Sequence, residues 1–168
     1  NLPLTPDKWP RGLHARLVEN LVSKGAKVIA FCVTFDEVRS PEQDILFAHA
    51  IKNAGNVVLC ERLKREEIRF TDKKGMSIET LGMERLVPPI PPLADSAVAL
   101  APFPLPKVPV QLSQCWMFKT GVGDTPTVPV VVFQIFAMDI YDEFVSLLKG
   151  ISPSHADMLP HYKDSVIE

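Results

Sequence analysis

The chain has 168 residues, 46% of them hydrophobic and 23% charged, so it is long enough to bury a core and has the composition of an ordinary globular domain. Its formal net charge of −2 excludes a strongly basic surface, and nucleic acid is therefore not expected as a partner. The longest apolar stretch, residues 128–138, is well short of the roughly 20 residues that a membrane-spanning helix needs. We expect the chain to be soluble as given, as an excised piece of a longer protein.

The first predicted element is a helix between Pro10 and Gly25, because proline is favoured in the first turn of a helix and glycine just beyond its end. Its expected buried face is the set of apolar residues at helical spacing: Leu13, Leu17, Val18, Leu21 and Val22. Arg11 and His14 begin this helix. We interpret His14 as a residue on the flank of the helix rather than a ligand.

A strand is predicted over 26–35, where apolar side chains alternate onto both faces. That pattern is typical of a central strand covered on both sides. A second apolar strand follows over 56–63.

The segment between these strands predicts a helix. Ser40 is its expected N-cap, Pro41 its first residue, Gln43 the reciprocal capping-box residue and Gly55 its C-terminal glycine. The residues expected to face the core are Leu46, Phe47, Ala50, Ile51 and Ala54. Two strands joined through this helix predict a parallel βαβ unit with a right-handed crossover.

The next segment predicts a polar hairpin with its turn at 72–75. Its arms carry apolar residues: Ile68 and Phe70 in one, Met76, Ile78 and Leu81 in the other. Eight prolines between Pro88 and Pro109 exclude a long helix, although a short helical piece fits around 93–100.

The last predicted elements are a strand over 108–118 with one buried face, and a long helix. The helix starts at 125–127 and runs to about Leu148, with Gly150 at its end. Its expected apolar stripe is Phe133, Ala137, Ile140, Phe144 and Leu147. The tail over 151–168 shows no periodicity.

Candidate metal ligands occur in the tail and after the first strand. His155, Asp157 and His161 have no known zinc spacing, so solvated side chains are the favoured interpretation. Four acidic residues follow the first strand: Asp36, Glu37, Glu42 and Asp44. The carboxyl ends of strands are where open α/β sheets bind ligands, but acidic residues are also favoured in a helical first turn. The structural role is preferred, and a metal-dependent hydrolase using Asp36 with Asp44 stays as an alternative. We expect no catalytic residue, no metal and no cofactor.

The three cysteines, Cys32, Cys60 and Cys115, lie in apolar contexts and indicate buried, inert thiols. Cys32 could face Cys60 if the two predicted strands are neighbours. Cysteines on adjacent strands rarely meet the dihedral requirement of a disulfide, so this bond is not expected.

Residues 9–63 resemble the start of a CHASE2 domain. The matching positions, in order, are Trp9, Pro10, Arg11, His14, Gly25, Ala26, Ile29, Phe31, Phe35, Asp44, Ala50, Gly55, Asn56, Val57, Val58 and Leu59. The segments "PPIPPLADSAVAL", "LPK" and "DTPTVPVVVFQ" are similar to the continuation of the same domain. The family's usual acidic residue inside the first strand is Cys32 here, and its final strands are not recognisable after residue 150.

The resemblance implies an extracytoplasmic (periplasmic) sensory domain of a bacterial membrane receptor. It implies an unidentified small-molecule or ionic ligand and, in the intact protein, transmembrane helices with a cytoplasmic adenylate cyclase, histidine kinase or serine/threonine kinase as output. The domain itself is not expected to be an enzyme. A homodimer is a further expected partner, and a ligand-free dimerisation module is the other alternative.

The sequence therefore predicts an α/β domain over 1–150, with 151–168 as a tail or the start of a next segment. The fold expected is a central mixed sheet with a parallel βαβ unit, helices packed on the sheet, and an antiparallel hairpin. The candidate ligand-binding residues are Asp36, Arg11, His14 and Asp44.

Overall fold

The computed structural model describes residues 5–71, 77–105 and 115–156. Contacts within the chain divide it into two compact units, 1–133 and 134–168. The expected division into a domain over 1–150 and a tail over 151–168 stays a prediction.

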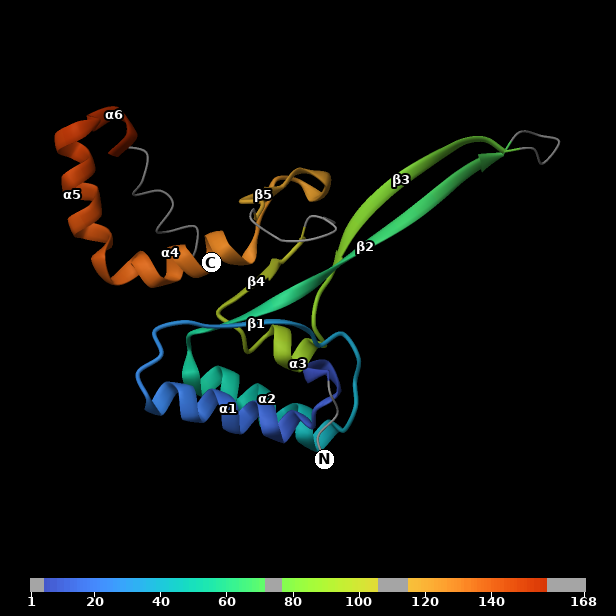
Figure 1. Cartoon of the computed structure of the whole chain (residues 1–168), viewed down its shortest axis with the longest axis horizontal. Coiled ribbons are helices and arrows are strands. Elements are labelled where there is room, and N and C mark those ends of the chain that lie inside the picture. The colour runs from blue at the N-terminus through green and yellow to red at the C-terminus, as the bar shows by residue number, and fades with distance from the viewer. Residues whose placement is uncertain (1–4, 72–76, 106–114, 157–168) are drawn as a thin grey trace. The chain divides into compact units, whose positions relative to one another are not determined.

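The first unit contains the predicted βαβ unit and one further parallel strand. The βαβ unit consists of β1 (Ile29–Thr34), α2 (Pro41–Ala54) and β2 (Val57–Thr71), and the further parallel strand is β4 (Ala99–Pro102). β1 and β4 both pair in parallel with the first residues of β2, so β2 lies between them (Figure 1). The second half of β2 pairs antiparallel with β3 (Ser77–Val87). The predicted α/β class, with a mixed sheet and an added hairpin, is confirmed.

The interpretation of 26–35 as a central strand covered on both faces is wrong for the described residues. There β1 pairs with β2 alone, and its register shifts by a bulge between Phe31 and Thr34. Ile29 and Phe31 are buried, whereas the alternate residues Ala30 and Cys32 are exposed. The apolar run encodes one buried face rather than two, and the central strand is β2.

The helix α1 (Arg11–Ser23) forms as predicted but buries a different face. It follows a short 3₁₀ turn, η1 (Pro6–Lys8), and is followed by Gly25 at φ 80°. Its buried residues are Arg11, His14, Ala15 and Val18, whereas Leu17 and Val22 are each 40% exposed. The buried set has the i, i+3, i+4, i+7 spacing of one helical face. The prediction chose the neighbouring leucine stripe because it considered apolar residues only, and two of the buried residues, Arg11 and His14, are polar.

The helix α2 has the predicted bounds but not the predicted capping box. Ser40 makes no side-chain capping bond, and Gln43 Oε1 instead accepts a hydrogen bond from the Gly12 N–H of α1 at 2.9 Å. The buried residues of α2 are Asp44, Phe47, Ala48, Ala50 and Ile51. Leu46, expected inside, is 47% exposed.

The core lies between α1, α2 and one face of the sheet. The two helices contact each other along their lengths and lie on the same side of the strands (Figure 1). The buried cluster consists of Ala15, Val18, Ile29, Phe31, Phe35, Phe47, Ala48, Ala50, Ile51, Val57, Leu59, Ile90 and Leu93. Each large side chain in it contributes roughly 1.5–3 kcal/mol by leaving water.

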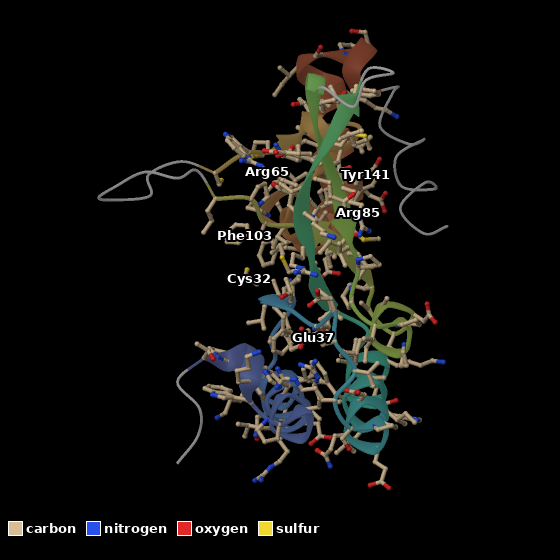
Figure 2. All side chains as sticks on the ribbon, turned by 90° about the vertical axis from the view of Figure 1, so that its right-hand side faces the viewer. Cys32, Glu37, Arg65, Arg85, Phe103 and Tyr141 are labelled. Atoms are coloured by element: carbon tan, nitrogen blue, oxygen red, sulfur yellow. The ribbon has the colours of Figure 1, made fainter. Side chains whose placement is uncertain are left out.

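The predicted hairpin is an extension of β2 rather than a separate element. β2 continues from the parallel sheet into a two-stranded ribbon with β3, paired from Arg62 opposite Val87 to Thr71 opposite Ser77. Ion pairs cross the ribbon, with Arg65 Nε 2.8 Å from Glu84 Oε1 and Arg85 Nε 3.0 Å from Glu66 Oε1. Figure 2 labels Arg65 and Arg85 along it. The predicted turn at 72–75 lies outside the described residues.

The proline-rich segment holds a short helix, α3 (Pro91–Ala94), and the strand β4. The helical piece expected around 93–100 is therefore shorter and earlier, and its second half is a strand that sequence reasoning missed. β4 tolerates Pro102 because that residue is the last of the strand. Most of the strand predicted over 108–118 lies outside the described residues.

The segment after residue 115 begins with three short elements: β5 (Phe118–Lys119), η2 (Thr120–Val122) and β6 (Thr125–Pro126). The buried residue Thr127 lies between β6 and the helix α4 (Val128–Ala137). Thr127 Oγ1 donates to the backbone carbonyl groups of Trp116 and Met117, and its distance to the Met117 oxygen is 3.1 Å. Val128, Val130 and Val131 follow it as buried residues.

The single long helix predicted to Leu148 is broken. α4 gives way to a 3₁₀ turn, η3 (Met138–Ile140), which is followed by α5 (Tyr141–Ile151) and α6 (Pro153–Ala156). The break has neither proline nor glycine to mark it in the sequence. Phe133, Phe144 and Leu147 of the predicted stripe are at least half exposed.

Gly55 offers a direct test of the α2 terminus. It has φ 67°, and its N–H donates to the Ile51 carbonyl at 3.1 Å. Because a side chain is disfavoured in this left-handed conformation, Gly55→Ala should lower the free energy of unfolding by about 1 kcal/mol. Urea denaturation measures this loss. The matched control is Gly82→Ala in β3, where a Cβ meets open space and φ is not positive. Equal losses in the two variants would contradict the assigned helix end.

Candidate functional site

A buried ion pair joins the beginnings of α1 and α2. Arg11 Nε lies 3.1 Å from Asp44 Oδ1, and both side chains are almost completely shielded from water. Arg11 is the first residue of α1, and Asp44 lies in the first turn of α2. Two of the four candidate ligand residues are therefore bound to each other inside the protein.

The same two residues hold the loop that leaves β1. Arg11 Nη2 donates to the carbonyl of Glu37 at 3.1 Å, and the N–H of Arg39 donates to Asp44 Oδ2 at 3.0 Å. Glu37 lies where the strands meet the helices (Figure 2). Residues 36–40 are thus hydrogen-bonded to both helices, and we call Arg11, Asp44 and this loop the latch.

The positive charge of Arg11 is disfavoured by burial and favoured by Asp44. Burial lowers its pKa, and the hydrogen bond and charge of Asp44 act in the opposite direction. Its carbon lies 4.5 Å from the ring centroid of Phe35, a cation–π contact, while Nη1 has no hydrogen-bond partner among the described residues. Asp44 is therefore the carboxylate on which the charge of Arg11 depends.

His14 lies in the core beside the latch, so the prediction that it is a flank residue is wrong. Its side chain is 2% exposed and its ring contacts four aromatic rings, with centroid distances between 5.2 and 6.1 Å. These rings are those of Trp9, Phe31, Phe35 and Phe47. We call this set the aromatic cage.

The side chain of Asp36, the first residue of the latch loop, pairs with a different arginine from that of Asp44. It forms an ion pair with Arg62 of β2, whose side chain is 52% exposed. Asp36 and Asp44 are thus held by two different guanidinium groups. The two-carboxylate metal site of the hydrolase alternative has no support in this arrangement, and no group of three metal-ligating side chains occurs within 5–71, 77–105 and 115–156. Of the tail candidates, Asp157 and His161 lie outside the described residues.

The cysteines differ from the expected buried, inert thiols. Cys32 and Cys115 are exposed, and Cys60 alone is buried. Burial raises the pKa of Cys60 to about 11 and also raises that of Cys32. All three thiols are free in the structure. The bulge in β1 places Thr34 rather than Cys32 opposite Cys60.

Sequence reasoning missed Arg62 and Gln43 as partners. Arg62 lies within the second predicted strand, and its charge, opposite to that of Asp36, was the available signal. Gln43 carried a capping-box signal that pointed to the wrong partner, because its bond to Gly12 spans 31 residues of sequence.

The latch gives a stability prediction. Asp44→Ala should lower the free energy of unfolding by about 3–5 kcal/mol, because it leaves the buried Arg11 charge uncompensated. Asp36→Ala is the matched control: its arginine is half exposed, so the loss should stay below about 1 kcal/mol. Urea unfolding of both variants measures the difference. Similar losses would show that the Arg11–Asp44 pair is no more important than a surface ion pair.

A comparison with protein-family models matches the CHASE2 domain over residues 4–149, which is most of the chain. Neither a curated protein nor a solved structure matches significantly. Among the described helices, none has the length and apolarity needed to cross a membrane. CHASE2 domains are extracytoplasmic sensory domains of signalling receptors and form a non-catalytic family. The family match extends well beyond the residues around the latch, and the chain belongs to the CHASE2 family.

Proposed function

We propose that this chain is the extracytoplasmic input domain of a membrane-anchored signalling protein. It binds a small molecule or an ion and passes a conformational signal to a cytoplasmic cyclase or kinase. The observation that carries the proposal is the family match over residues 4–149.

The rim of the sheet at the end of β1 is the proposed ligand edge. Ligands of open α/β sheets bind beyond the carboxyl ends of the strands, and Asp36 lies two residues after β1. Its ion pair with the half-exposed Arg62 presents both charges near the surface. A ligand carrying a carboxylate or an ammonium group can compete for one partner of this pair. Arg11, His14 and Asp44 support this edge from within.

The latch supplies a physical route from this edge to the helices. Asp36 begins the loop whose later residues, Glu37 and Arg39, bond to Arg11 and Asp44. A ligand that moves the loop must therefore stretch bonds to α1 and α2 together. Because those helices pack on each other and on the sheet, the proposed signal is a change in their packing.

A ligand-free dimerisation module is the second candidate, and one observation favours it. The ribbon carries an exposed apolar face made of Ile68, Phe70, Leu81 and Met83. These residues share one side because Ile68 pairs with Leu81, and Phe70 and Met83 each lie two residues from a member of that pair. A stable dimer in solution that is lost on Phe70→Ser would support this candidate.

A thermal-shift screen tests the ligand proposal. The panel contains amino acids, dicarboxylates, nucleotides and inorganic ions, each added to the purified domain. We expect at least one member to raise Tm in proportion to the logarithm of its concentration. The shift should be lost in Asp36→Ala and kept in Glu19→Ala, which removes an exposed carboxylate of α1.

The signalling part of the proposal is tested in the intact protein. A compound that binds the domain should change the second-messenger or phosphotransfer output of the membrane-bound protein, and Asp36→Ala should abolish that response. Binding that leaves the output unchanged would contradict the input function. A panel without any binder, together with a ribbon-dependent dimer, would favour the second candidate.

A further inference from the structure

The imidazole of His14 lies in a cage with few polar contacts. Besides Trp9 at 6.1 Å, the ring meets Phe31 at 5.8 Å, Phe35 at 5.2 Å and Phe47 at 5.5 Å between centroids. The three phenylalanine rings also contact one another at 5.3 to 5.7 Å. These contacts pack the imidazole tightly and leave it 2% exposed to water.

The two ring nitrogens of His14 differ in what they meet. Nδ1 lies 3.3 Å from the carbonyl oxygen of Pro10, which can only accept, so the neutral ring carries its proton on Nδ1. Nε2 is buried and makes no hydrogen bond among the described residues. A second proton must go to this Nε2 lone pair, where it creates a cationic N–H inside the aromatic cage.

The charged groups around the cage do not favour that cation. α1 contributes Arg11 and the loop before α2 contributes Arg39, and both oppose a positive charge on His14. α2 contributes Asp44, which already binds Arg11 and the Arg39 backbone, and the carbonyl of Glu37 accepts from Arg11. β1 contributes the ring of Phe31, and the segment before α1 contributes the ring of Trp9.

Burial is the largest influence on this histidine and lowers its pKa. The carbonyl groups of Pro10 and Pro6 act in the opposite direction but do not outweigh it. The folded domain therefore binds the proton more weakly than the unfolded chain does. Stability is present above the unfolded histidine pKa of about 6.5 and falls as the pH drops below that value.

We propose that His14, held neutral in the aromatic cage, is a pH-sensitive residue through which the domain responds to acidification outside the cell. Protonation of Nε2 forms one N–H bond at the expense of a hydronium ion, and the new charge is relieved when the ring leaves the cage. His14 lies one turn after Arg11 on α1, so this movement also loosens the latch. The inference rests on the proposed input function and names the proton as a stimulus of the domain.

The first test compares Tm across pH in two variants of the domain. Between about pH 7.5 and pH 5 the wild type should lose several degrees of Tm, because the unfolded histidine titrates near 6.5. His14→Phe keeps an aromatic ring in the cage and should flatten this pH dependence. His49→Gln, which removes an exposed histidine of α2, is the matched control and should keep it. Parallel profiles for the wild type and His14→Phe would overturn the proposal.

The pKa of Glu61 is shifted in the direction opposite to that of His14, so this carboxyl group does not interfere with the test. Burial raises the pKa of Glu61, so its folded form binds the proton more tightly than the unfolded form. That group adds stability as the pH falls. A loss of Tm on acidification therefore cannot come from Glu61.

The second test needs no substitution at His14. Titration of the four histidine rings of the wild type by NMR gives the His14 midpoint directly, and a midpoint below 6.5 is expected. In a Trp116→Phe background Trp9 is the remaining tryptophan, and its fluorescence should change with the same midpoint. A His14 midpoint at or above 6.5, or a Trp9 signal independent of it, would overturn the proposal even if His14→Phe does not fold.

Sensing itself is tested in the intact membrane protein. Lowering the external pH should change its output, and His14→Phe should remove that response, whereas the control His49→Gln should keep it. An output that follows the compound but not the pH overturns the proton proposal alone. An output that follows neither overturns the input function as well.

Discussion

The buried pair between Arg11 and Asp44 is the constraint on which the helical layer depends. A guanidinium at the start of a helix is repelled by the helix dipole, whereas a carboxylate in a first turn is attracted by it. Burial adds a desolvation cost for both. The arrangement is stable only because Asp44 meets the arginine and a loop amide together. The helices α1 and α2 must therefore start at the same edge of the sheet, beside the end of β1.

The remaining architecture follows from the length of β2. Its first residues are the middle of a parallel sheet, and its later residues form the ribbon with β3. Lys119 Nζ lies 2.7 Å from Glu84 Oε2 of β3, so the segment after residue 115 contacts the base of the ribbon. The hydrogen bonds from Lys119 and Arg65 lower the pKa of Glu84. One strand thus connects the core to an exposed arm, and the arm is fixed at its base by charge.

Local patterns in the sequence were sufficient for the βαβ unit and not for the site. Ser40, Pro41 and Gly55 predicted the bounds of α2 because helix ends depend on neighbouring residues. The buried face of α1 could not be found this way, since Arg11 and His14 become core residues only through Asp44 and three phenylalanine rings that are distant in sequence. The ribbon was predicted from alternation, but its continuity with β2 was not. β4 was missed because proline obscured a strand whose partner lies about 40 residues earlier.

Cys32 lies on the face of β1 that points away from the helices. The resemblance to the CHASE2 family predicts an acidic residue at this position. In this chain Cys32 is exposed, while the adjacent Phe31 is buried against the helices. Alternation along a strand directs neighbouring side chains to opposite faces, so an acid at position 32 would not reach Arg11. Asp44 is therefore the partner of Arg11 whichever side chain occupies position 32. The helical face of the sheet retains the latch and the cage regardless of what the other face binds.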